Sequence, residues 1–218
     1  MATSTSPAVD AAGAVAAGAG IHAPAAPTDS AAIVARRAAA ARATGAKLYG
    51  KWAPVGPHDS FCQITAADVA SCGGRDAWVA IFIEFYRRMT TDPILKQLFD
   101  RSDPDVDVPA EEHGWRFGMW MLARYGGVPE YMAKRGGHIF GNIGRAHTRA
   151  TRCPMRPAAH RGRGFTVRQR DTWLGYQHQA CVCKGVPDAV RSKLMGLHAG
   201  YGFAFIGPFE DLPHPPDA

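Results

Sequence analysis

Residues 76–90 read DAWVAIFIEFYRRMT, and this stretch decides the class of fold. Its large apolar side chains recur at helical spacing, on one broad face: Trp78, Ile81, Phe82, Phe85, Tyr86 and Met89. Such a face predicts an amphipathic helix that packs against other helices. Asp92-Pro93 follows directly and predicts the end of this helix, because the residue before a proline avoids the helical region.

Three further stretches downstream show helical periodicity. Residues 110–125 begin with Glu111 and Glu112, which suit the positive end of a helix, and two glycines follow. Residues 168–183 and 187–205 carry two more helical patterns. No window offers the alternation of a half-buried strand. The sequence therefore predicts an all-α domain over about residues 60–208.

The two ends of the chain differ from this helical part. Among the first 46 of the 218 residues there are twenty alanines and few large apolar groups. We therefore expect residues 1–59 to be a disordered extension, or to form only a marginal helix around residues 30–44. The low acid content of this extension also resembles a plastid or mitochondrial transit peptide. The proline-rich tail, residues 209–218, is expected to be loose.

Composition narrows the environment in which the chain works. Five cysteines are an odd number and argue against a disulfide framework, so a reducing compartment is expected: the cytoplasm, or an organelle if the extension is a targeting peptide. No window approaches ~18 consecutive apolar residues, and we expect no membrane span.

Positive charge is concentrated in one segment. Residues 134–170 hold ten Lys or Arg residues and no Asp or Glu, although the net charge of the whole chain is only +6. Such a segment is typical of a solvated loop, or of a surface that faces nucleic acid or another anionic partner. Neither interpretation of this segment explains the helical periodicity on either side of it.

Several residues could carry chemistry. His113 falls on the apolar face of its predicted helix, and Tyr86 and Trp173 are polar-tipped aromatic residues predicted to face the same interior. His147 and His160 lie in the basic segment. Taken together, an inward histidine, a loop histidine and several aromatic residues suit a helical bundle that encloses a large, flat, apolar cofactor.

These residues and their spacing resemble those of the truncated haemoglobins, in the second group of that family. The resemblance spans about residues 68–206 and rests on spacings that agree across several helices. Tyr86 follows Gly74 by twelve residues, and Phe99 follows Tyr86 by thirteen. The motif Tyr-Gly-Gly-x-Pro-x-Tyr occupies residues 125–131. Trp173 follows His160 by thirteen residues, and a tryptophan at that point is the hallmark of the second group.

The resemblance implies a 2-on-2 globin fold around haem b and a role for each matching residue. His160 would be the proximal ligand of the iron. The implied ligand pocket consists of Tyr86, His113, Phe117 and Trp173. Phe99 would pack on the haem face, and Arg116 would meet a haem propionate.

One departure from the family falls between Gly136 and His160, where this chain is longer by about sixteen residues. The inserted, arginine-rich loop covers about residues 137–159. Residues 143–147 also resemble the stretch that leads into the proximal histidine of plant-type members, so His147 is the alternative iron ligand.

The implied function is reversible binding of oxygen, nitric oxide or carbon monoxide, more a binding role than an enzymatic one. A nitric oxide dioxygenase or weak peroxidase would use the same residues, and the former would need an external reductase. Two alternatives dispense with haem altogether. One is a globin-like scaffold for protein partners, and the other is a nucleic-acid-binding module that uses the basic segment.

Overall fold

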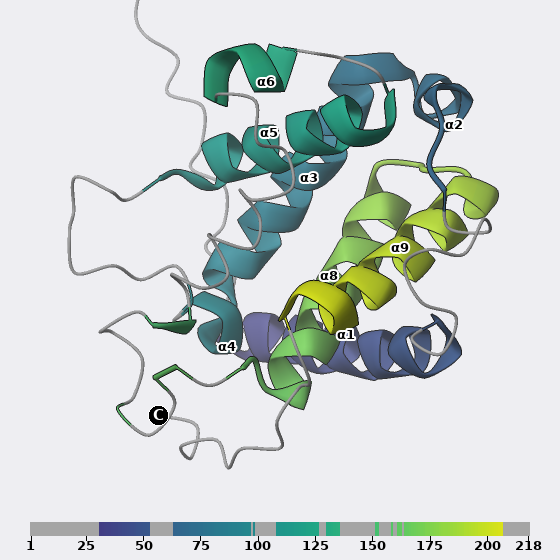
Figure 1. Ribbon diagram of the computed structural model, residues 1–218. Coiled ribbons are helices and arrows are strands. Elements are labelled where there is room, and N and C mark those ends of the chain that lie inside the picture. The colour runs from purple at the N-terminus through teal and green to yellow at the C-terminus, as the bar shows by residue number, and fades with distance from the viewer. Residues whose placement is uncertain are drawn as a thin grey trace, which may run out of the picture.

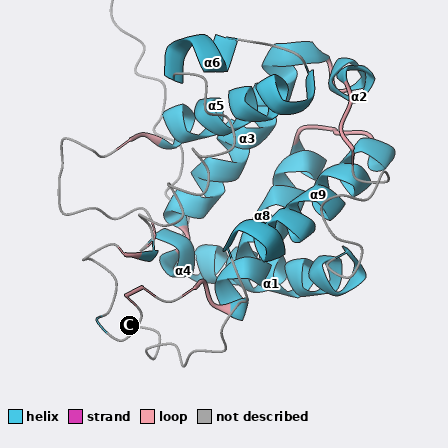
Figure 2. Cartoon of the chain, viewed as in Figure 1, coloured by secondary structure: helices cyan, strands magenta, loops and turns pink. Residues whose placement is uncertain are grey.

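The computed structural model describes residues 31–52, 63–96, 98, 108–126, 130–135, 151–152, 158, 161–162 and 164–206. Its elements are α1 (Ala31–Trp52), α2 (Ala66–Ser71), α3 (Gly74–Thr91), α4 (Pro93–Lys96), α5 (Ala110–Met121), the π-helix η4 (Leu122–Gly126), α6 (Glu130–Arg135), α8 (Val167–Cys183) and α9 (Asp188–Ile206). No strand occurs in these ranges, as Figure 2 shows. The prediction of an all-α class is confirmed.

The four longest predicted helices correspond to α3, α5 with η4, α8 and α9. They form two pairs, in which α3 packs against α5 and α8 packs against α9 (Figure 1). Helix α3 also packs against α8, so it joins the two pairs. Within the described ranges, no helix is both long enough and apolar enough to cross a membrane.

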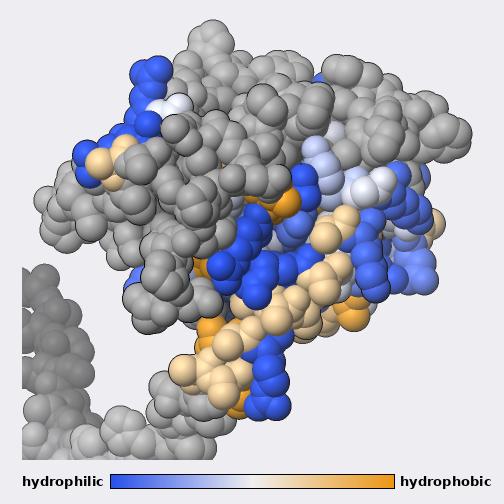
Figure 3. Space-filling model, turned by 90° about the horizontal axis from the view of Figure 1, so that it is seen from below, coloured by the Kyte–Doolittle hydropathy of each residue, from blue (hydrophilic) through white to orange (hydrophobic). Residues whose placement is uncertain are grey.

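The expectation that residues 1–59 lie outside the folded domain is corrected for residues 31–52. They form α1, which packs along α8 and extends the marginal helix expected at residues 30–44. Small residues make the closest points of this contact: a Cβ atom at Gly45 would overlap the backbone of Asp171, and one at Gly175 would overlap the backbone of Ala41. Such an interface leaves no pattern of large apolar side chains in the sequence. The opposite side of α1 mixes mildly hydrophobic with hydrophilic residues (Figure 3).

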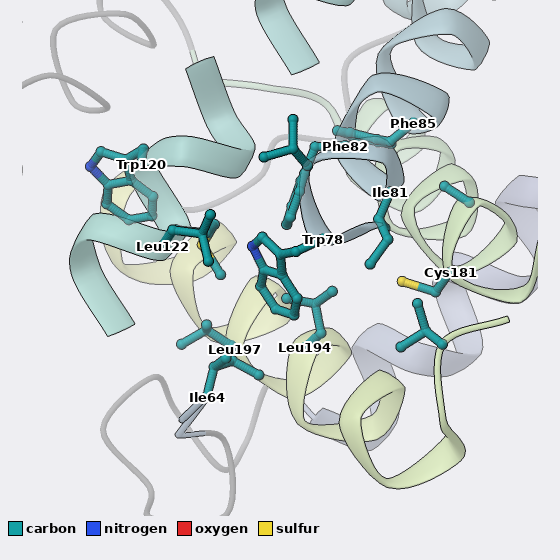
Figure 4. Close-up of a cluster of buried hydrophobic side chains, with 14 of the residues drawn as sticks. Ile64, Trp78, Ile81, Phe82, Phe85, Trp120, Leu122, Cys181, Leu194 and Leu197 are labelled. Atoms are coloured by element: carbon teal, nitrogen blue, oxygen red, sulfur yellow. The ribbon is translucent and has the colours of Figure 1, made fainter. Parts of the chain in front are cut away.

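The hydrophobic core lies between the two helix pairs. Trp78 of α3 stands in the middle of it, with a fully buried side chain, and is close to Leu194 in the view of Figure 4. Each large side chain buried in this way stabilises the fold by roughly 1.5–3 kcal/mol. The apolar face that the sequence predicted for residues 76–90 therefore supplies the centre of the core.

The corner between α3 and α4 is closed by Asp92, as the Asp-Pro signal predicted. Its carboxylate is fully buried and accepts hydrogen bonds from the backbone N–H groups of Ile94 (2.8 Å) and Leu95 (3.0 Å). Its second oxygen accepts a hydrogen bond from the hydroxyl of Tyr176 at 2.9 Å. This last bond fixes the end of α3 against α8.

The short helix α2 links the start of α3 to α9. Thr65 and Asp68 form a reciprocal N-terminal cap on α2, and Lys193 of α9 donates to both carboxylate oxygens of Asp68 at 2.9 and 3.0 Å. The chain then turns into α3 through Gly73, whose φ of +96° lies in the left-handed region that favours glycine.

Candidate functional site

The candidate site begins where α5 comes closest to α3. A Cβ atom at Gly114 would overlap the backbone of Ile83, and one at Gly118 would lie 3.0 Å from the Cα atom of Val79. Each glycine directly follows a predicted site residue, His113 or Phe117. The two glycines let the helix backbones meet, and so they carry these two side chains up to α3.

Tyr86 meets both of those side chains. Its ring stacks on the imidazole of His113, with ring centroids 5.3 Å apart and planes 11° from parallel. The ring of Phe117 stands edge-on to Tyr86 at 6.3 Å. All three side chains are half-buried, whereas Phe85 beside them is fully buried. The site therefore lies at the margin of the core and not in its centre.

Trp173 of α8 joins this group through two further rings. Phe85 lies edge-on to the indole at 5.5 Å and also contacts Tyr86 at 5.2 Å. On its other side, Trp173 meets His198 of α9 at 5.2 Å, and His198 stacks on Phe117 at 5.5 Å. The contacts thus form a closed circuit of five rings, which we call the aromatic circuit: Tyr86, Phe85, Trp173, His198 and Phe117.

Burial sets the protonation state of two members of the aromatic circuit. It raises the pKa of the Tyr86 phenol above its ordinary range, and the nearby phenol of Tyr131 adds to this increase. Tyr86 therefore keeps its hydroxyl proton at any physiological pH. Burial lowers the pKa of His198 to about 3, so its imidazole is neutral.

Two residues of this region were not assigned a role from the sequence. His198 is 1% exposed and lies one helical turn after Leu194, so the periodicity of residues 187–205 places it on the inner face. Tyr131 on α6 is buried and lies near the Tyr86 phenol. It belongs to the Tyr-Gly-Gly-x-Pro-x-Tyr motif, but spacing alone does not show what it approaches.

The remaining predicted site residues divide into two kinds. Arg116 is half-buried and pairs with Glu112 one turn earlier on α5, with 2.7 Å between Nε and Oε1. Phe99, His147 and His160 lie outside the described residues, as does most of the 137–159 loop. The choice between His160 and His147 as iron ligand stays a prediction.

No family model, curated protein or solved structure matches this chain. The function is therefore argued from its residues and their geometry. Among the described residues, no group of three or more His, Cys, Asp or Glu side chains could hold a metal ion. What the described site offers is an aromatic wall with polar tips: the hydroxyl of Tyr86, the imidazoles of His113 and His198, and the indole N–H of Trp173.

Proposed function

We propose that this chain is a haem-binding protein of the truncated-globin type that reversibly binds oxygen or another diatomic gas. The aromatic circuit carries the proposal. Tyr86, Phe117 and Trp173 come from three helices that are distant in the sequence, and the fold joins them in one circuit, with His113 stacked on Tyr86. These are the four side chains that the family resemblance implies for a ligand pocket.

The residues fit a flat, apolar cofactor with a polar ligand site above it. Tyr86, Phe117 and Trp173 are half-buried at the core margin, whereas Phe85 and His198 are buried. The Tyr86 hydroxyl and the Trp173 indole N–H are hydrogen-bond donors. His160, or alternatively His147, would hold the iron, and Phe99 and Phe117 would pack on the cofactor. Arg116 would meet a propionate in place of Glu112. The chemistry that haem b supplies when bound is coordination of a diatomic gas at iron.

The role of the chain is to orient donors toward the gas. The hydroxyl of Tyr86 and the indole N–H of Trp173 donate, because neither loses its proton at physiological pH. Each hydrogen bond of this kind is worth about 0.5–1.5 kcal/mol, and more in a dry pocket. Several donors favour slow release of the gas, which suits storage, sensing or redox chemistry better than rapid delivery.

The absorption spectrum of the full chain, expressed with haem available, tests this proposal. We expect a sharp Soret band that shifts on reduction and shifts again with carbon monoxide. Paired visible bands in the reduced, gas-free state would show that a protein side chain also occupies the sixth position of the iron. A folded, helical protein that stays colourless would overturn the proposal.

Two matched variants identify the iron ligand. His160→Ala should abolish haem retention, whereas His147→Ala should keep the haem and its ferrous spectrum. The reverse pattern would make His147 the ligand.

Turnover of nitric oxide by the oxygenated protein with an added reductase distinguishes a dioxygenase from a simple binding protein.

A further inference from the structure

His198 is a buried polar residue with no assigned role. Its side chain is 1% exposed, and neither of its ring nitrogens has a hydrogen-bond partner among the described residues. Three aromatic rings surround it: Phe117 at 5.5 Å, Trp173 at 5.2 Å and Phe82 at 6.3 Å between ring centroids. His198 is thus the buried polar member of the aromatic circuit.

A neutral imidazole offers one N–H donor and one acceptor nitrogen. Leaving both without a partner in an apolar core destabilises the folded state. A phenylalanine at this position would make the same ring contacts without that penalty. Packing alone therefore does not explain the imidazole at this position. Its two nitrogens indicate that a small polar molecule binds there.

Two further polar atoms of the core are in the same condition. Trp78 Nε1 and Gln177 Oε1 are buried and have no partner among the described residues. Trp78 contacts Phe82, which also contacts His198, and Gln177 lies one helical turn after Trp173 on α8. Buried polar groups of this kind are commonly satisfied by an internal water with two to four hydrogen bonds.

We propose that His198 holds a water molecule at the inner end of the proposed gas site, and that a gas entering the site displaces this water. The water bonds the imidazole through a ring nitrogen, and we assign its second bond to the indole of Trp173, whose ring centroid lies 5.2 Å from that of His198. The displacement step rests on the proposed function, whereas the water itself does not. His198 thus becomes a binding residue of the pocket and not merely a part of its wall.

Nuclear magnetic resonance of the full chain, labelled with nitrogen-15 at histidine, tests the water directly. We expect magnetisation to pass from long-lived water to the ring N–H of His198 in the gas-free protein, with or without haem. A resolved His198 N–H signal that receives nothing from water would overturn the proposal. His178, half-buried on α8, is the control because it is not in the circuit.

Carbon monoxide rebinding after photolysis tests the displacement. His198→Phe should change the fraction that rebinds from within the protein at least twofold, while His198→Gln, which keeps a donor and an acceptor, should stay near the unmodified protein. Equal fractions in all three would overturn the displacement step. If the chain takes up no haem, the proposed function fails, and the water measurement still decides the role of His198.

Discussion

At the scale of single residues, Trp173 lies where the aromatic circuit would meet the proposed gas ligand. Its indole meets Phe85 on one side and His198 on the other, so its orientation is fixed by two buried rings. The sequence predicted that Trp173 belongs to the site. It did not reveal His198, because a lone histidine in a helical pattern gives no sign of which rings it will meet.

Replacing Trp173 with phenylalanine removes the indole N–H but keeps an aromatic ring. We expect Trp173→Phe to retain haem and to release oxygen roughly two- to tenfold faster, the loss of about one hydrogen bond. Stopped-flow displacement of oxygen measures the rate. Trp115→Phe on α5 is the control, since Trp115 is not in the aromatic circuit, and an equal acceleration there would contradict the assignment.

His198 also makes stability depend on pH. Its pKa is about 3 in the folded protein and near 6.5 in the unfolded chain, so only the unfolded chain takes up this proton as the pH falls below about 6.5. The free energy of unfolding should therefore decrease by up to about 1.4 kcal/mol per pH unit from pH 6.5 downward.

Urea titrations at pH 7, 6, 5 and 4 measure this slope. His198→Gln removes this titrating group and should make the curve shallower between pH 6 and pH 5, a range above the ordinary titration of carboxylates. The lowered pKa of half-buried His178 leaves a smaller slope there. An equally steep curve in the variant would show that another group is responsible.

At the scale of elements, the helices that bury large apolar groups were predicted closely, and those that bury small ones were not. The pattern of residues 76–90 became α3, and the Asp-Pro signal marked its end. For α1, the sequence predicted only a marginal helix at residues 30–44 and not its packing. Its close contacts are made at Ala41 and Gly45, which leave no hydrophobic stripe in the sequence. The glycines that bring α5 onto α3 likewise leave no hydrophobic stripe, so the sequence predicted the helix but not its close approach to α3.

Gly114 is the tighter of the two glycine contacts between α5 and α3. We expect Gly114→Ala to push the helices apart, to separate His113 from Tyr86 and to lower the free energy of unfolding by about 1–3 kcal/mol. Gly50→Ala in α1 is the matched control, because a Cβ atom there meets nothing within 4 Å. Denaturant unfolding with near-ultraviolet circular dichroism measures both effects, and similar behaviour of the two variants would contradict the prediction.

At the scale of the whole molecule, the two helix pairs and α1 act as one packed body. The all-α class followed from the sequence alone, whereas the angle and closeness of the helices did not. Those depend on residues such as Gly175, which contact partners far along the chain. Phe82 and His198, over a hundred positions apart, meet because α3 and α9 share a core.

Removing α1 should expose the face of α8 that it covers. We expect a chain without residues 1–52 to lose at least about 2 kcal/mol of stability, equivalent to the burial of one large apolar side chain. Gly175→Ala in the full chain should reproduce much of this loss, because its methyl group would displace Ala41. Unfolding midpoints of the three proteins compare these effects, and an unchanged midpoint after removal of α1 would contradict them.

The interface between α1 and α8 also governs the order of events during synthesis. Ala41 leaves the ribosome early, but its contact Gly175 follows 134 residues later. At 5–20 residues per second, the small-residue face of α1 waits on the order of ten seconds for its partner. Because this contact bridges so much chain, the loop-closure cost leads us to expect that it forms late in folding. We therefore expect α1, the first helix among the described residues, to dock late.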